Sequence, residues 1–377
     1  MTFPAARAAL AAALLVGLTA GPLAAPALAH ERPAVAADQR GPDRTALEKA
    51  LKGLPDSLAT SAIVRVGGHG TWRGSAGVRD VRTGAKVIEN ARFRAGSTTK
   101  VVTAALVLKL AAQGRIDLDG TVQQYLPGLL TSDFAPITVR QLLNYTSGLQ
   151  PGKSLGDTVD ESYPHRFETL TPQEVVAASV AQGPGHAPGA EQRYGNIHYL
   201  VLAMIVEKAT GDTYAHQAEV QVLRPLGMRD TSFPAGGDPR IHGPHNRGYE
   251  DMDGRLVDVT EWNVSDRWAA GDMISTLPDL ERLMVGLIGG RLLPQAQRDE
   301  LFAVPDLPGA RYGAGLERIV VNGREVWGKT GARPGYHTVV AATKTLDRTL
   351  VYSVTATDAH TDGLVLAQRF AFPAFNR

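Results

Sequence analysis

A serine and a lysine three residues apart could carry out nucleophilic chemistry together. Ser97 and Lys100 belong to the run Phe93-Arg-Ala-Gly-Ser-Thr-Thr-Lys, which leads into an apolar stretch ending near Gln113. A serine at a helix entrance commonly caps free N–H groups, but a capping box has Glu or Gln three residues later. A cation there also opposes the helix dipole, at a cost of about 0.3–1 kcal/mol. We infer that the Lys100 amine is used, by hydrogen-bonding Ser97 with a pKa lowered by burial and by the dipole.

A phenol and an amide form a second candidate pair. Tyr194 and Asn196 flank Gly195, just before an apolar helical stretch. In an extended loop these two side chains point to the same side. The phenol could then carry a proton and the amide could bind an acyl-amide group. The structural alternative is a tyrosine packed at a helix start, with Asn196 as the N-cap.

A third motif, Lys329-Thr330-Gly331, follows Trp327 near the end of a predicted strand. Lys329 offers a fixed positive charge, Thr330 a hydroxyl group, and Gly331 space for a ligand lying along the strand. Alone, this motif favours an ordinary charged strand end, and Ser-x-x-Lys alone is a weak signal because it is common. The joint pattern of a helix start, a loop and a late strand is far rarer, and we interpret the three motifs as one site.

The elements that must position these motifs follow from periodicity and from turn residues. Helices are predicted over residues 43–52, 97–113, 138–143, 172–181, 197–209, 213–223, 277–288 and 362–372. Strands are predicted over residues 62–66, 71–78, 85–88, 315–321, 324–328, 336–343 and 349–357. Strands near both ends of the chain, with helices between them, predict an α+β fold. In it, one antiparallel sheet is built from both chain ends, flanked by helices and interrupted by a mostly helical insertion.

The motifs resemble those of a known family. Ser-x-x-Lys at a helix entrance and Lys-Thr-Gly on a late strand are the signature pair of penicillin-binding proteins and serine β-lactamases. The Tyr-x-Asn motif makes the chain similar to the class C branch, which includes class C β-lactamases, D-alanyl-D-alanine carboxypeptidases and related esterases. Residues 137–149, 269–276 and 334–336 also resemble family segments, so that the resemblance covers roughly residues 40 to 372. It implies the β-lactamase/transpeptidase-like fold.

The resemblance implies an acyl-enzyme mechanism. Ser97 would attack a carbonyl group, and Tyr194, with Lys100 and Lys329 favouring its ionised form, would relay the serine proton to the leaving group. Whether Lys100 or Tyr194 is the base stays open. Water would then release the acyl group. Gly195 departs from the family pattern, in which Ser or Ala is more familiar, and we expect it to loosen the loop without removing a functional group.

The same resemblance implies how substrate is bound. The backbone N–H groups of Ser97 and Ala332 would form an oxyanion hole, each donor being worth about 3 kcal/mol. Asn196 would bind the acyl amide, and Thr330 with Lys329, beside Gly331, would bind a substrate carboxylate. No cofactor or metal is implied.

The implied substrate is a peptidoglycan-type peptide or a β-lactam, and the first expectation is a serine D-Ala-D-Ala carboxypeptidase. A class C-like β-lactamase and a related esterase remain alternatives, since all three share acylation and differ in how water releases the adduct. An intact Lys329-Thr330-Gly331 argues mildly against a plain esterase. A non-catalytic penicillin-binding or cell-wall-binding protein would lack a nucleophile, base or lysine, and none is missing.

Composition and the first residues predict the destination of the protein. The chain has 377 residues, 44% hydrophobic and 20% charged, with a net charge of +1, which provides no electrostatic case for nucleic acid or an anionic membrane. Residues 1–29 read as a secretory signal, with Arg7 before an apolar run and Ala27-Leu-Ala as the cleavage site. Residues 30–41 then form a loose leader and residues 42–377 the catalytic domain. We expect a secreted, extracellular or periplasmic protein without a stable membrane anchor, and a monomer. The absence of cysteine excludes a lipid-modified cysteine, a cysteine nucleophile and thiolate metal sites.

Three other features have competing interpretations. His242-x-x-His245 has zinc-ligand spacing but lies in a Gly/Pro-rich loop without a clear third ligand, which favours solvated histidines. Asp251-Met-Asp-Gly254 lacks the glutamate that completes a calcium loop, so a hairpin turn is favoured. Arg333 could touch a substrate carboxylate or be a surface charge.

Overall fold

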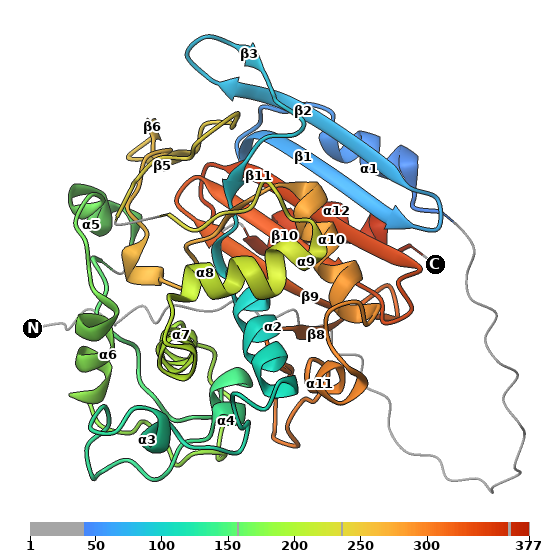
Figure 1. Cartoon of the computed structure of the whole chain (residues 1–377). Coiled ribbons are helices and arrows are strands. Elements are labelled where there is room, and N and C mark those ends of the chain that lie inside the picture. Colours follow the sequence, from blue (N-terminus) through green and yellow to red (C-terminus); the bar gives the residue numbers. More distant parts are fainter. Residues whose placement is uncertain (1–40, 157, 235–236, 361–362, 377) are drawn as a thin grey trace, which may run out of the picture.

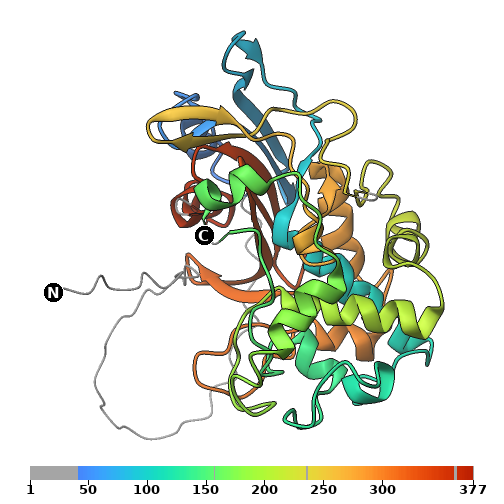
Figure 2. The ribbon, with the colours of Figure 1, turned by 90° about the vertical axis from the view of Figure 1, so that its left-hand side faces the viewer.

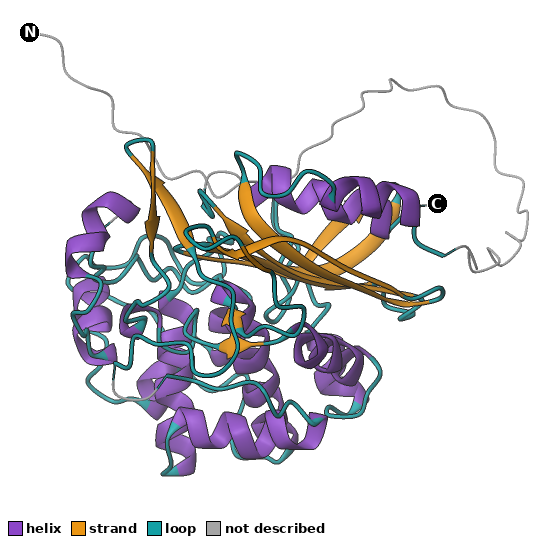
Figure 3. Ribbon diagram, turned by 90° about the horizontal axis from the view of Figure 1, so that it is seen from above, coloured by secondary structure: helices purple, strands orange, loops and turns teal. Residues whose placement is uncertain are grey.

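The computed structural model describes residues 41–156, 158–234, 237–360 and 363–376. A twisted sheet has a pair of helices on one face and the larger helical part of the chain on the other (Figures 1 and 3). In the view turned by 90°, most of the helices lie to one side of the sheet (Figure 2). The predicted signal, residues 1–29, and all but the last residue of the predicted leader lie outside the described residues. Among the described residues, no helix is long and apolar enough to cross a membrane.

The sheet has seven strands in the order β3-β2-β1-β11-β10-β9-β8, and every neighbouring pair is antiparallel. Its strands are β1 (Ala59–Gly68), β2 (Trp72–Asp80), β3 (Ala85–Lys86), β8 (Glu317–Val321), β9 (Arg324–Arg333), β10 (Tyr336–Ala342) and β11 (Arg348–Ala356). The N-terminal strand β1 pairs with the C-terminal strand β11, with Val64 opposite Tyr352. This pairing confirms the predicted α+β fold, with a sheet built from both ends of the chain.

The helices separate into two layers. Those of eight or more residues are α1 (Arg44–Leu51), α2 (Thr99–Ala112), α6 (Pro172–Val180), α7 (Ile197–Thr210), α10 (Leu277–Ile288) and α12 (Gly363–Ala374). The shorter ones are α3 (Val122–Tyr125), α4 (Val139–Leu143), α5 (Val159–Ser162), α8 (Tyr214–Ala218), α9 (Arg224–Leu226) and α11 (Gln295–Glu300). Single turns are η1 (Gly96–Thr98), η2 (Tyr163–His165), η3 (Glu219–Leu223) and η4 (Ser265–Arg267). Helices α1 and α12 share a core with the outer face of the sheet, whereas α2, α7 and α10 belong to the larger core.

Helix α2 lies at the centre of that larger core. Nearly every residue from Thr99 to Leu110 is buried, including Val101, Leu106 and Lys100. This agrees with the all-round apolar pattern of the sequence, since a helix with no polar face must be covered on every side. The 3₁₀ turn η1 precedes it and carries Ser97. The nucleophile candidate therefore lies at the entrance of the most enclosed helix.

The element predictions hold in kind and differ in extent. Asn322 and Gly323 both have positive φ and join β8 to β9 as a two-residue hairpin, as predicted. Strand β9 runs on to Arg333, beyond the predicted residue 328, because β10 pairs with it along that length. The predicted helix over residues 213–223 is divided, with α8 followed by a π-helical turn.

Two small sheets lie outside the main sheet. Strand β4 (Phe93–Arg94) pairs with β7 (Ile274–Ser275) beside the start of α2. Strands β5 (Tyr249–Met252) and β6 (Arg255–Asp258) form a hairpin whose turn residues, Asp253 and Gly254, both have positive φ. The structure therefore confirms the hairpin turn predicted for residues 251–254.

Candidate active site

Close backbone packing sets the position of Ser97. Gly96 has φ +53°, and a Cβ there would lie 2.7 Å from the Ala332 nitrogen. A Cβ on Gly331 would lie 2.1 Å from the Ala95 carbonyl oxygen. Because both residues are glycines, the end of β9 can lie directly against η1. This contact brings the third motif to the first, as the sequence predicted, with the backbone of Ala332 beside that of Gly96.

The Lys100 amine is buried and has three oxygen neighbours. Its Nζ lies 3.0 Å from Ser97 Oγ, 2.7 Å from Asn196 Oδ1 and 2.7 Å from the Ala270 carbonyl oxygen. Its side chain is fully buried. Burial, reinforced by the positive charges of Lys329, Arg267 and Arg333, lowers the pKa of Lys100 well below its usual value.

These contacts suit a neutral amine, which has two N–H groups and one lone pair. Asn196 Oδ1 and the Ala270 carbonyl can only accept hydrogen bonds, so they take the two N–H groups. The Ser97 hydroxyl can donate, and it is left facing the lone pair. Lys100 can therefore accept the Ser97 proton without first losing one of its own.

Side chains of α2 hold the segment that carries the Ala270 carbonyl, on both sides of that residue. Thr103 Oγ1 donates to the Ala269 carbonyl oxygen at 2.6 Å and lies 2.8 Å from the Tyr214 hydroxyl. The Met273 N–H donates to Thr99 Oγ1 at 3.2 Å. Ala269 itself has φ +56°. The segment 269–273, which the sequence argument placed only by family resemblance, thus supplies an orienting group for the lysine.

Tyr194 lies between the two lysines. The centroid of its ring is 5.1 Å from Lys100 Nζ and 4.6 Å from Lys329 Nζ. Its hydroxyl is buried and lies near the Ser97 hydroxyl, although among the described residues it makes no hydrogen bond of ordinary length and angle. Burial raises the pKa of the Tyr194 phenol above its usual value, and the Ser97 hydroxyl and Arg267 offset this only in part. The phenol is therefore protonated in the free protein, whereas the sequence argument expected the lysines to favour its ionised form.

The Tyr194 ring is fixed by other aromatic rings that the sequence argument did not single out. Tyr145 lies 5.0 Å and Tyr312 5.5 Å from it, between ring centroids. The Gln192 side chain holds this group together, since it donates to the Asn144 and Tyr312 carbonyls at 2.9 and 2.8 Å. Gln192 also accepts from the backbone N–H groups of Arg311 and Tyr312. Nothing local marks Gln192, because its partners are about 50 and 120 residues away in the chain.

Asn196 stands at the N-cap position of α7, but its side chain does not cap the helix, so the structural alternative holds for its position and is wrong for the role of its side chain. Its Oδ1 is occupied by Lys100, whereas its amide nitrogen makes no hydrogen bond among the described residues. The amide N–H groups therefore remain for a substrate carbonyl. Ser97 likewise makes no side-chain cap at the start of α2.

The end of β9 forms one edge of the site. Lys329 is buried, and its Nζ donates to the Thr330 carbonyl oxygen at 3.0 Å. The Thr330 side chain is exposed. Strand β8 pairs with β9 only as far as Gly328, so on that side no described strand pairs with residues 329–333. An extended ligand could bind this edge through backbone hydrogen bonds.

Arg333 is not a surface charge. It is 6% exposed, and its Nη2 lies 3.9 Å from Asp266 Oδ1, while Asp266 also pairs with Arg267 at 2.9 Å. Burial lowers the pKa of Arg333 to about 10 and raises that of Asp272 to about 7. Lys329, Arg267 and Arg333 outnumber the nearby acids, Asp266 and Asp272, so the site is positively charged even with Lys100 neutral.

The two histidines of the His242-x-x-His245 motif make hydrogen bonds to neighbouring residues of their own loop. His242 Nε2 lies 2.6 Å from Asp238 Oδ2, and His245 Nδ1 lies 2.8 Å from the Gly243 carbonyl oxygen. Within the part of the chain that the structure describes, no group of three His, Cys, Asp or Glu side chains is placed to hold a metal ion.

Comparison with known proteins finds a matching family and similar solved structures. Residues 47–371 match the family described as Beta-lactamase. The chain is similar to a D-stereospecific amidohydrolase from Streptomyces sp., with 32% identity and a TM-score of 0.76 over 87% of this chain and 99% of that one. It is also similar to a D-amino acid amidase from Ochrobactrum anthropi, with 25% identity and a TM-score of 0.70 over 86% of this chain and 96% of that one.

A curated relative is an esterase, EstB of Burkholderia gladioli, which is 30% identical over 206 residues, or 52% of each chain. The matches to the first curated relatives span only 40% to 52% of their length.

Proposed function

Because this chain belongs to the β-lactamase family of serine hydrolases, we propose that it is a secreted D-alanyl-D-alanine carboxypeptidase acting on peptidoglycan-type peptides. Residues 1–29 would direct export, and the mature protein would act as a monomer without a cofactor. One observation carries the acyl-enzyme chemistry: the Lys100 amine faces the Ser97 hydroxyl with its two other hydrogen-bonding positions filled by acceptors.

Acylation then uses Lys100 as base and Tyr194 as acid. The Ser97 proton passes to the Lys100 lone pair while Oγ forms a bond to the substrate carbonyl carbon. The Tyr194 phenol, protonated because it is buried, gives its proton to the leaving nitrogen as the carbon–nitrogen bond breaks. Lys100 then passes the serine proton to the Tyr194 phenolate, which restores both side chains. The net change is the loss of one proton from Ser97 and the gain of one by the released amine.

Substrate binding uses the edge of β9 and the positive charge of the site. The N–H groups of Ser97 and Ala332 would receive the developing oxyanion. Lys329 and the exposed Thr330 hydroxyl would bind the terminal carboxylate. Arg267, which is partly exposed, adds to the field that attracts an anion. This field favours a peptide with a free carboxylate over a neutral ester.

A D-amino acid amide is a second candidate substrate, since the Ochrobactrum protein is named a D-amino acid amidase and the Streptomyces protein a D-stereospecific amidohydrolase. Such a substrate has no carboxylate for Lys329 and Thr330. The class C-like β-lactamase and esterase alternatives also share the acylation step, and they differ in the leaving group and in the rate of deacylation.

The test combines two measurements on the wild-type protein and on Ser97→Ala. Labelled penicillin should attach to Ser97 and persist for minutes, and acyl-D-Ala-D-Ala should release D-alanine; Ser97→Ala should do neither. Fast turnover of penicillin without D-alanine release would assign a β-lactamase instead. Preferential hydrolysis of a D-amino acid amide would assign an amidohydrolase. Absence of the label and of every hydrolysis would refute the acyl-enzyme.

A further inference from the structure

A buried histidine contacts the backbone next to Tyr194. His198, in the first turn of α7, is 1% exposed. Its Nε2 lies 3.1 Å from the carbonyl oxygen of Arg193, and its Nδ1 lies 2.9 Å from the hydroxyl of Ser147. Neither His198 nor Ser147 has a part in the chemistry described above.

The partners of His198 determine its tautomer. A backbone carbonyl can only accept, so Nε2 carries the proton and donates to Arg193. Nδ1 is then an acceptor, and the Ser147 hydroxyl donates to it. Ser147 Oγ in turn accepts from the Leu149 N–H at 3.1 Å. Burial lowers the pKa of His198 to about 4, so the ring is neutral at neutral pH.

Gly195 provides the space for this ring. A Cβ at position 195 would lie 3.2 Å from His198 Nε2 and 3.3 Å from Cδ2, closer than ordinary van der Waals contact. Gly195 does not have a positive φ. The presence of glycine at position 195 is therefore explained by the close approach of the histidine and not by an unusual backbone conformation. Gly195 therefore does not leave the loop open as its sequence predicts, because a buried side chain lies against it.

We propose that His198, oriented by Ser147, is a positioning residue that holds the peptide preceding Tyr194, and that Gly195 is the matching small residue. The Arg193 N–H donates to the Tyr145 carbonyl oxygen at 2.9 Å, so both backbone polar groups of Arg193 are bound. Tyr145, which binds the Arg193 N–H, and Ser147, which orients His198, both belong to the segment 145–149. The Tyr145 ring also contacts Tyr194 and His198. The phenol is thereby aimed at the leaving group. This inference rests on the proposed function.

The test exploits the different proton needs of two leaving groups. An amine must be protonated as it leaves, whereas p-nitrophenolate leaves without a proton, so misplacing the Tyr194 acid affects an amide or peptide far more than an ester. The variants are His198→Phe, which removes both hydrogen bonds, and His198→Gln, which keeps an N–H donor for Arg193. The measurement is kcat/KM for a peptide and for the p-nitrophenyl ester of the same acyl group.

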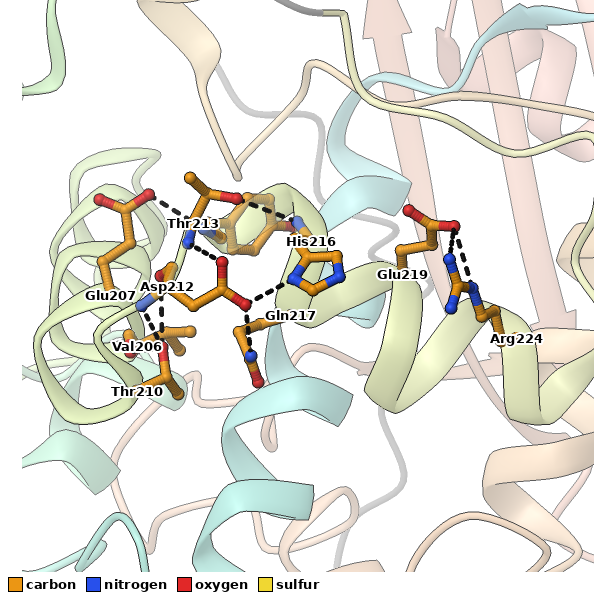
Figure 4. Close-up of polar contacts among 10 residues, drawn as sticks. Val206, Glu207, Thr210, Asp212, Thr213, His216, Gln217, Glu219 and Arg224 are labelled. Atoms are coloured by element: carbon orange, nitrogen blue, oxygen red, sulfur yellow. Dashed lines mark hydrogen bonds and ion pairs between the residues drawn. The ribbon is translucent and has the colours of Figure 1, made fainter.

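We expect His198→Phe to lose about 10- to 100-fold in kcat/KM on the peptide and less than about threefold on the ester. His198→Gln should recover most of the loss. Gly195→Ala should show the same selective loss as His198→Phe, because it displaces the ring. His216→Phe is the matched control: it removes the hydrogen bond from a histidine in the first turn of α8 to Asp212, which lies 2.5 Å away (Figure 4).

Equal losses on both substrates, or no difference between the Phe and Gln variants, would overturn the proposal, because a merely structural defect lowers both activities alike. Thermal unfolding of each variant shows whether the fold is retained. NMR of the His198 ring nitrogens supplies a readout independent of activity: the Nε2–H tautomer is expected down to about pH 5, and a protonated ring at neutral pH would refute it. If the wild-type protein hydrolyses nothing, the proposed function fails, while the tautomer measurement still decides the role of His198.

Discussion

Replacing Glu250 by glutamine should change how the stability of the protein depends on pH. Glu250 lies on β5 and is 3% exposed, and its Oε1 accepts from the Gly335 N–H at 2.7 Å. It thereby ties the β5–β6 hairpin to the turn between β9 and β10, two residues after Arg333. Burial raises the pKa of Glu250 from 4.5 to about 8, with the negative charges of Asp358 and Asp160 adding to the effect.

The sign of the effect follows from where the proton is held. Between pH 4.5 and about 8 the folded state keeps the Glu250 proton and the unfolded state has lost it, so the free energy of unfolding falls as pH rises. At 1.36 kcal/mol per pH unit, the loss across this window is at most about 5 kcal/mol. It is absent below pH 4.5 and complete above pH 8. A glutamine resembles the protonated acid and has no proton to lose.

The assay is urea unfolding of wild type and Glu250→Gln at a series of pH values from 5 to 9. The wild-type free energy of unfolding should decline relative to the variant as pH rises, and the difference should level off above about pH 8 to 9. Glu174→Gln is the control: hydrogen bonds from Thr171 lower the pKa of Glu174, so its contribution changes only below the ordinary glutamate range, and its curve should stay parallel to that of wild type from pH 5 to 9. Parallel curves for wild type and Glu250→Gln would refute the argument that burial keeps this carboxyl protonated.

Other substitutions test the site and the core. Lys100→Met should reduce penicillin acylation of Ser97 by about 10³-fold, as expected for loss of a general base; retention of the wild-type acylation rate would exclude Lys100 as the base. Gly331→Ala places a Cβ 2.1 Å from the Ala95 carbonyl and should slow acylation by displacing β9 from η1, which stopped-flow labelling would detect. Thr330→Val should raise KM for a peptide with a free carboxylate and leave KM for its amide unchanged, whereas equal effects would remove Thr330 from carboxylate binding. Leu106→Ala, at a fully buried position, should lower the free energy of unfolding by about 2–5 kcal/mol in denaturant titration; a loss under about 1 kcal/mol would contradict the packing described for α2.

The local pattern of the sequence determined most of the secondary structure and the identity of the three motifs. The all-round apolar run after Ser97 required an enclosed helix, and the Asn322-Gly323 pair required a tight hairpin. These features depend on residues a few positions apart, so propensity and turn chemistry are sufficient to predict them. The Ser97, Tyr194 and Lys329 motifs were recognisable for the same reason, since each is a short contiguous string.

The tertiary structure alone decided how those groups behave. The lowered pKa values of Lys100 and Arg333 and the raised pKa of the Tyr194 phenol result chiefly from desolvation by segments distant in the chain. No local signal marked the Ala270 carbonyl that accepts from Lys100 or the Gln192 side chain that binds the Asn144 and Tyr312 carbonyls. The same is true of the close contact between His198 and Gly195. A sequence specifies which groups are present, but the charge state and aim of a group depend on what surrounds it, and only folding assembles those surroundings.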